Sequence, residues 1–298
     1  MIRVEAPAKL NFSLRVGSVE RSGFHPLDSL VQTINWQDEL AAQWWEDDIL
    51  EITGAEDLAG GSAELPTGTD NLIWKAAEAF WQSQSDVRRK PMRVRLNKQI
   101  PTAAGLAGGS ADAAATLVAL AGLTRRSIDH GGVPAIGSDV PFALLGGTAR
   151  MEGYGEQLTP VPPLSDFSLV VAVPPVTLST PAVYREWDRL GGPAGPAIKG
   201  RSVPPSLRGH DLVNDLYRAA ISLAPELVEH RDHLGSIWGR EVAMSGSGPS
   251  LFGFFGDLDE AQEAAAATSG MRAVRAVDPV SHGARVTWDE SDYTDTVR

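Results

Sequence analysis

Residues 101–114 carry the strongest chemical signal in the sequence and read PTAAGLAGGSADAA. Glycine lets a backbone turn its N–H groups inward, and a helix that starts there adds unpaired donors and the positive end of its dipole. Such a combination can hold phosphate groups. The stretch matches neither the Walker A pattern nor Gly-x-Gly-x-x-Gly, and a tight turn between a strand and a helix is the alternative interpretation. The small residues before the alanine-rich segment favour anion binding.

Other residues could complete a reaction site. Ser110 could cap the helix and also bond a phosphate oxygen or a ligand of magnesium. Asp139 has apolar neighbours in IGSDVPF, which suits a general base, although an aspartate after Gly-Ser more often ends a turn or caps a helix. Lys9 is by default a surface lysine, and SGSG at 245–248 is by default a hairpin turn whose backbone could approach a ligand. Each signal is weak alone, whereas their combination and order are informative.

Composition narrows the possible functions. The 298 residues carry a formal net charge of −12, which disfavours binding to nucleic acid or to an anionic membrane surface. There is no cysteine, so thiolate metal sites and cysteine nucleophiles are excluded. The six histidines show no tight ligand spacing, and we predict no protein-held metal site. No apolar run is long enough to span a bilayer and no secretory signal is visible, which predicts a cytoplasmic protein.

The remaining pattern predicts the elements that must position these residues. A first strand is expected over 1–16, interrupted at 6–11, and Asn71 begins a helix. Residues 27–36 form a further apolar segment, and strands are predicted over 92–96, 167–173, 274–277 and 284–288, with a strand pair around 245–248. Further helices are predicted over 110–121 and 181–190, on both sides of 224–225, and from about 257 onward. The segments 54–68 and 191–209 are predicted loops, the second of them mobile. Strands and helices mix without a regular βαβ repeat, so the predicted fold class is α+β.

Three blocks occur in an informative order: PAKLN at 7–11, the glycine-rich stretch at 101–114, and MSGSG at 244–248. In this order they resemble the GHMP kinase superfamily, whose members phosphorylate galactose, homoserine, mevalonate and related alcohols. Within it, the chain is similar to the branch of 4-diphosphocytidyl-2-C-methyl-D-erythritol kinases of the non-mevalonate isoprenoid pathway. The features that select this branch are PAKLN at 7–11, RSGFHPLDSL at 21–30, GSDVPF at 137–142 and NDL at 214–216. The Gly-Phe-His part is the most specific, because it belongs to the cytidine pocket of that branch.

The resemblance implies a fold and a reaction. It implies an ATP-binding domain at 1–160 and a ferredoxin-like domain at 161–298, with the substrate in the cleft between them. ATP and Mg²⁺ would serve to phosphorylate the 2-hydroxyl of the substrate, a cytidine diphosphate derivative. Asp139 would take the proton from that hydroxyl, and Lys9 would lower the pKa of the hydroxyl or neutralise charge near it. The protein would be a monomer or a homodimer.

The resemblance also implies the binding residues. Asn11 would bond the methylerythritol portion, and His25 would read the cytosine edge. Phe24 would stack on one face of the base with Tyr184 on the other, while Thr180 and Pro181 would lie near the diphosphate. The residues implied at the ATP site are Pro101, Ala103, Ala104, Gly105, Leu106, Ala107, Gly108, Gly109 and Ser110, with Asn71 and Lys98 beside the adenosine.

The chain departs from the branch at several positions. Ala107 and Ala111 stand where glycine and serine are usual. Phe24 replaces the commoner tyrosine, which keeps the stack but loses a hydroxyl. Tyr184 stands where phenylalanine is common.

The largest departure lies at residues 123–136, where the branch has a full helix. Gly131, Gly132 and Pro134 are poor helix residues, so we predict at most one helical turn over 124–134. The apolar residues expected to anchor the following region in the core are Val140, Phe142, Leu144 and Leu145.

The position of Asp139 tests the kinase interpretation. Its carboxylate should lie within side-chain reach of the Lys9 amine, in the same cleft as the 105–110 loop. Two alternatives stay open, a GHMP kinase for another alcohol such as mevalonate and a catalytically silent nucleotide-binding homologue. The pair Phe24 and His25 argues against the first, and the joint presence of Lys9, Ser110 and Asp139 argues against the second.

Overall fold

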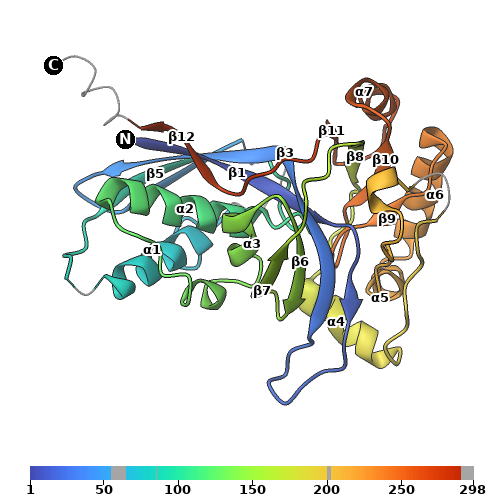
Figure 1. The fold of residues 1–298 in the computed structure, drawn as a ribbon, viewed down its shortest axis with the longest axis horizontal. Helices are drawn as coiled ribbons and strands as arrows, with labels where there is room; N and C mark the ends of the chain where they lie inside the picture. Colours follow the sequence, from blue (N-terminus) through green and yellow to red (C-terminus); the bar gives the residue numbers. More distant parts are fainter. Residues whose placement is uncertain (55–64, 85, 200–202, 290–298) are drawn as a thin grey trace.

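The computed structural model describes residues 1–54, 65–84, 86–199 and 203–289. Within them, the strands form one eight-stranded and one four-stranded sheet, and helices accompany both sheets (Figure 1). The fold is α+β, as the sequence predicts.

The large sheet is built around one long strand, β3 (Leu27–Trp44). The order along the main path is β12-β1-β3-β5-β4, and only β4 and β5 pair in parallel. Strands β2 and β6 also pair with β3, and β7 pairs with β6. The other strands of this sheet are β1 (Ile2–Asn11), β2 (Arg15–Val16), β4 (Ile49–Thr53), β5 (Met92–Asn97), β6 (Thr148–Gly153), β7 (Gln157–Pro160) and β12 (Arg285–Asp289).

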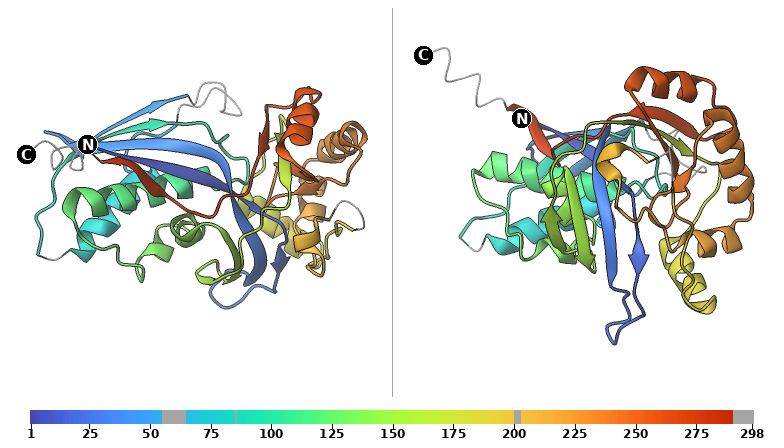
Figure 2. Two further views of the ribbon diagram at one scale, coloured as in Figure 1. Left: turned by 45° about the horizontal axis from the view of Figure 1, so that its top comes forward. Right: turned by 45° about the vertical axis from the view of Figure 1, so that its right-hand side comes forward.

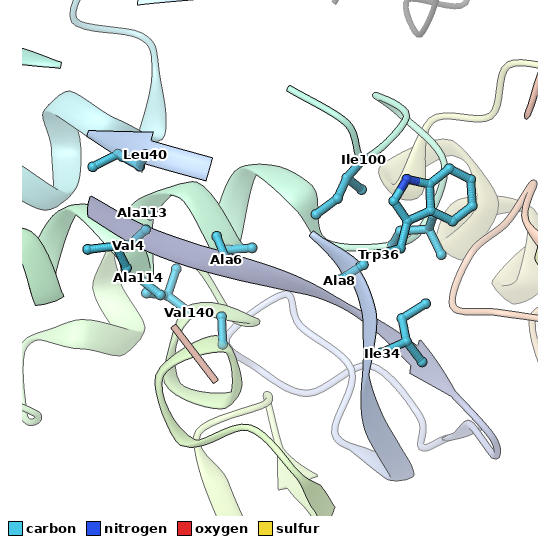
Figure 3. Packing of buried hydrophobic residues seen from close by; sticks show 14 of the residues in the cluster. Val4, Ala6, Ala8, Ile34, Trp36, Leu40, Ile100, Ala113, Ala114 and Val140 are labelled. Atoms are coloured by element: carbon cyan, nitrogen blue, oxygen red, sulfur yellow. The ribbon is translucent and has the colours of Figure 1, made fainter. Parts of the chain in front are cut away.

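Helices cover one face of the large sheet (Figure 2). They are α1 (Leu72–Ser83), α2 (Gly108–Thr124) and α3 (Val140–Leu145). Figure 3 shows Val4 of β1 beside Ala113 and Ala114 of α2, and these small side chains let the helix lie close to the strand. The opposite face carries exposed charged residues such as Arg3 and Arg95, so one side of this sheet faces water.

The small sheet has the order β11-β8-β10-β9. With the helices between its strands, this is the order of a ferredoxin-like unit. Its strands are β8 (Ser168–Val173), β9 (Ala243–Met244), β10 (Leu251–Phe255) and β11 (Ala273–Val277). Its helices are α4 (Thr180–Arg189), α5 (Tyr217–Leu223), α6 (Glu226–Trp238) and α7 (Leu258–Ala266).

The chain returns from the small sheet to the large sheet at its last described strand. β12 pairs with β1 at the edge of the large sheet, although it follows the strands of the small sheet in the sequence. The division into domains at 1–160 and 161–298 therefore stays a prediction, and the large sheet takes one strand from the second range.

Most predicted elements are present, and several differ from the prediction in extent. The first strand is not interrupted at 6–11, because β1 runs unbroken to Asn11 and accommodates Pro7 by a register shift against β3. Ser110 is not the cap of α2, which begins at Gly108 after Ala107 in the left-handed region. Strands β4, β6 and β7 and helix α3 were not predicted.

The unusual segment before Asp139 has the predicted form. α2 ends at Thr124, and between there and Pro134 the chain makes only the start of a 3-10 turn, η1 (Val133–Ala135). Val140 and Phe142 are buried as expected, whereas Leu145 is 40% exposed and its predicted anchoring role is wrong.

The predicted loops fall partly outside the described residues. Residues 55–64 of the first and 200–202 of the second are not described. The described part of 191–209 contains the 3-10 turn η3 (Pro205–Leu207) and a bridge from Ala197 to Val213. Among the described helices, none is long and apolar enough to cross a membrane. The cytoplasmic location stays a prediction.

Candidate active site

A cleft of about 1360 Å³ takes residues from both sheets and their helices. Its size exceeds that of a typical single-ligand pocket and leaves room for two ligands side by side. Every residue predicted for the site lines it except Ser110. The structure thus brings together segments from residue 9 to residue 247, while the role of each residue stays a prediction.

Lys9 and Asp139 meet in this cleft. Lys9 and Asn11 point the same way because they are two residues apart on β1, and Lys9 Nζ donates to Asn11 Oδ1 at 2.6 Å. Lys9 Nζ also lies 3.5 Å from Asp139 Oδ2, which confirms the expected proximity. Asp139 directly precedes α3, but its side chain makes no capping bond, so helix capping does not explain it. The surroundings of Asp139 are less apolar than its sequence neighbours indicate, since its side chain is 26% exposed.

The glycine-rich loop has the backbone that an anion site requires. Gly105 and Ala107 both have positive φ, of 77° and 57°, and α2 begins at the next residue with its N-terminal N–H groups free of a side-chain cap. A Cβ on Gly105 would lie 2.9 Å from the carbonyl oxygens of Ser245 and Gly248. Only glycine fits here, because the loop packs directly on the third sequence block.

Hydrogen bonds join all three sequence blocks. The Lys9 amide donates to the Leu106 carbonyl at 3.1 Å, and the Asn11 amide donates to Ser245 Oγ at 3.0 Å. The Ser250 amide and hydroxyl both donate to the Ala104 carbonyl. These contacts hold the three blocks, which are distant in the sequence, next to one another in the structure.

A buried charge cluster beneath the glycine-rich loop was not predicted. Lys98 Nζ donates to Asp112 at 2.8 Å and also to Asp38, and all three side chains are buried. Burial raises the pKa of Asp112 to about 7, the Lys98 charge opposes this rise, and the Asp38 charge adds to it. A Cβ on Gly108 would lie 2.9 Å from Lys98 Nζ, so the cluster directly supports the start of α2. The predicted adenosine-side role of Lys98 stays a prediction, but its ammonium is already paired.

Aromatic rings gather at the predicted cytidine end. Phe24 is 66% exposed and packs on Tyr154, with 6.0 Å between ring centroids. His25 packs on Tyr184 at 5.3 Å, and both of its ring nitrogens face protein oxygen atoms. Burial raises the pKa of Tyr184 to about 12, and the negative charge of Asp139 adds to the rise. The Tyr184 hydroxyl therefore stays protonated at neutral pH.

Other predicted residues serve local structure as well as the cleft wall. Thr180 Oγ1 lies 2.8 Å from Ser247 Oγ and connects the start of α4 to the third sequence block. Asn71 caps α1 by accepting from the Ile73 amide. The polar residues that line the cleft and that sequence reasoning missed include Tyr154, Arg185 and Asp188. The last two lie close to Tyr184 on α4, which is the signal that could have found them.

Comparison with known proteins agrees with this geometry. Residues 71–147 match the GHMP kinases N terminal domain family. A 4-diphosphocytidyl-2-C-methyl-D-erythritol kinase of Saccharopolyspora erythraea is 39% identical over 97% of this chain and 95% of its own. The kinase of the same name from Moorella thermoacetica is 36% identical over 89% of this chain and 94% of its own.

Solved structures give the same result. A crystal structure of 4-(cytidine 5'-diphospho)-2C-methyl-D-erythritol kinase superposes with a TM-score of 0.75 and 32% identity, covering 93% of this chain and 99% of that one. A homoserine kinase from Cytophaga hutchinsonii, at 17% identity and a TM-score of 0.66, shares the fold. Identity of this extent over nearly the whole length, together with the converging sequence blocks, shows that the chain belongs to the 4-diphosphocytidyl-2-C-methyl-D-erythritol kinase family of GHMP kinases.

Proposed function

We propose that the protein transfers the γ-phosphoryl group of ATP to the 2-hydroxyl of 4-diphosphocytidyl-2-C-methyl-D-erythritol. The observation that carries this proposal is the position of the Lys9–Asp139 pair. The pair shares one cleft with the glycine-rich loop and with the aromatic group around His25. Phosphoryl transfer asks mainly for positioning and for neutralisation of charge, and this arrangement can supply both.

The residues take the following roles in the proposed reaction. Asp139 accepts the proton of the acceptor hydroxyl while the hydroxyl oxygen forms its bond to the γ-phosphorus and the bond to the β–γ bridging oxygen breaks. ADP leaves with that bridging oxygen. Lys9, 3.5 Å from Asp139, keeps the carboxylate in place and lowers the energy of negative charge developing at the acceptor oxygen. The N–H groups at the start of α2 bind the phosphates.

The cleft also has room for Mg²⁺ bound to the phosphates. This ion commonly takes one or two protein oxygens and leaves its other positions to phosphates and water. A Cβ on Gly137 would lie 3.8 Å from Ser110 Oγ, so this hydroxyl lies beside the segment that carries Asp139. Ser110, which does not line the cleft itself, would bond a phosphate oxygen or a ligand of the ion, and the ion would supply charge neutralisation to the phosphates.

A comparison of acceptors tests the proposed function. We expect turnover of the cytidylyl-methylerythritol substrate with magnesium-ATP, and little or no turnover of mevalonate or homoserine. Neither of these two alcohols carries a nucleobase that could fill the aromatic end of the cleft. ADP release in a coupled assay measures this. Comparable rates with mevalonate would contradict the assignment of the substrate while leaving the kinase activity standing. No turnover of any acceptor would favour the silent homologue.

Phe24 provides a second test. A large exposed aromatic side chain in a cleft wall is available for stacking, and stacking on a base is worth about 1–3 kcal/mol. Phe24→Ala should therefore raise KM for the cytidylyl substrate about 5-fold or more. KM for ATP should hardly change.

Phe24→Tyr is the matched control, because it keeps the ring and restores the commoner residue of the branch. It should retain the KM of the unmodified protein in the same steady-state assay. An equal rise of KM for ATP in Phe24→Ala would place Phe24 at the adenine end or in a purely structural role.

A further inference from the structure

Four protein groups hold the ring of His25. Its Nδ1 lies 2.9 Å from the Gly17 carbonyl oxygen, and its Nε2 lies 3.2 Å from Asp188 Oδ2. Tyr184 packs on the ring face, and Trp187 meets the ring edge-on at 5.5 Å between centroids. The His25 side chain is only 8% exposed. His25 is therefore a fixed part of the cleft wall, and whichever ring nitrogen carries a proton has an oxygen acceptor.

Helix α4 supplies three of these four groups. Tyr184, Trp187 and Asp188 are spaced i, i+3 and i+4, so they share one face of the helix. Asp188 also lines the cleft, and its side chain is 43% exposed. Its contact with His25 is a polar link between α4, beside the small sheet, and the segment 17–26, which joins β2 to β3 of the large sheet.

The segment 17–26 has a second attachment on its other side. The Tyr154 hydroxyl donates to Glu20 at 2.6 Å and lies 3.1 Å from Ser22 Oγ. This segment also carries Phe24 next to His25, with Phe24 packed on Tyr154. Contacts from Tyr154 and from α4 thus set the position of Phe24 before any ligand binds.

We propose that Asp188 is a positioning residue for the cytidine end of the substrate, an inference that rests on the proposed function. It holds the His25 ring against Tyr184 and thereby holds the 17–26 segment against α4. Without Asp188 the segment would have to be ordered when the nucleotide binds, and that cost weakens binding. Lys9 and Asp139 are not part of this contact, so the rate of the chemical step should not change.

The first measurement separates KM from kcat. Asp188→Ala should raise KM for the cytidylyl substrate about 10-fold, the loss expected for one charge-assisted hydrogen bond. KM for ATP and kcat should stay within about a factor of two. Asp188→Asn keeps an acceptor oxygen and should lose much less. Glu186→Ala is the control on the same helix. The Glu186 carboxylate bonds Arg189 and Ser222 and not His25, so its removal should leave KM unchanged.

A double-mutant cycle with His25→Ala tests the route of action. If Asp188 acts through His25, adding Asp188→Ala to His25→Ala should raise KM no further. If KM of the double variant rose by the product of the two separate increases, the inference would be overturned, and Asp188 would contact the substrate directly. An active protein whose KM is unchanged by Asp188→Ala would also overturn it, while the proposed function would stand. An unmodified protein that does not phosphorylate the cytidylyl substrate would remove the proposed function and this inference together.

Discussion

Replacing Asp139 by asparagine should lower kcat roughly 10²–10⁴-fold, the usual contribution of a general base. Asparagine has nearly the same shape but cannot accept the proton of the acceptor hydroxyl. Asp139 makes no capping bond to α3, so the change should leave the local fold intact. Steady-state kinetics gives kcat, and titration calorimetry with ATP should show nucleotide binding largely retained.

Asp86→Asn is a matched control for Asp139→Asn. Asp86 also pairs with a cation, Arg126 at 2.9 Å, but its side chain is 63% exposed, and the pair should contribute little. Its kcat should equal that of the unmodified protein. If Asp139→Asn kept more than about half of the normal kcat, the base would lie elsewhere and Lys9 with Mg²⁺ would carry the reaction by electrostatics.

Features that depend on neighbouring residues were predictable from the sequence. Asn71 caps α1 through a bond to an amide two residues away, which any sequence with this cap and apolar face can form. Gly131, Gly132 and Pro134 disfavour a helix wherever they occur, and the chain indeed makes only a short 3-10 turn there. Local propensity decided these cases, because no tertiary contact opposed it.

The path of β3 was not predictable in the same way. The apolar segment visible in the sequence ends at Trp36, because the polar run Gln37, Asp38, Glu39 that follows is typical of a solvent-exposed turn. In the structure the strand continues to Trp44, because β1 and β5 pair with it on both sides. Asp38 is fully buried there and finds its cation on a distant segment. No pattern within β3 identifies that partner.

Helix α4 illustrates a related limit within the site. Its start at Thr180 and Pro181 was predictable, but the use of its face was not. Asp188 gains a role only because the 17–26 segment brings His25 to it from the other sheet. Residues that act on another residue, rather than on the ligand, carry no motif of their own.

Asp38→Ala should reduce the free energy of unfolding by about 3–5 kcal/mol, the usual cost of removing one partner from a buried ion pair. Asp38 accepts from Lys98 Nζ and from the amides of Gln99 and Ile100, the latter at 2.8 Å. Alanine leaves the amides of Gln99 and Ile100 without this acceptor and leaves Lys98 with Asp112 alone. Urea unfolding followed by tryptophan fluorescence measures the loss, which is a large share of a typical total of about 5–15 kcal/mol.

Asp38→Asn separates the two contributions. Its side-chain oxygen can still accept from the Gln99 and Ile100 amides. Its NH2 group takes the place of Oδ2 and cannot accept from Lys98 Nζ, so the charge opposite Lys98 and one hydrogen bond are lost. Lys98 and Asp112 then form an ion pair with no net charge. Removal of the Asp38 charge lowers the pKa of Asp112, which favours its ionised form in that pair. The asparagine variant should therefore be clearly more stable than the alanine variant. Equal losses would mean that the charge opposite Lys98 matters more than the two amide bonds. An alanine variant within about 1 kcal/mol of the unmodified protein would show that the cluster does not anchor the strand end that leads into the glycine-rich loop.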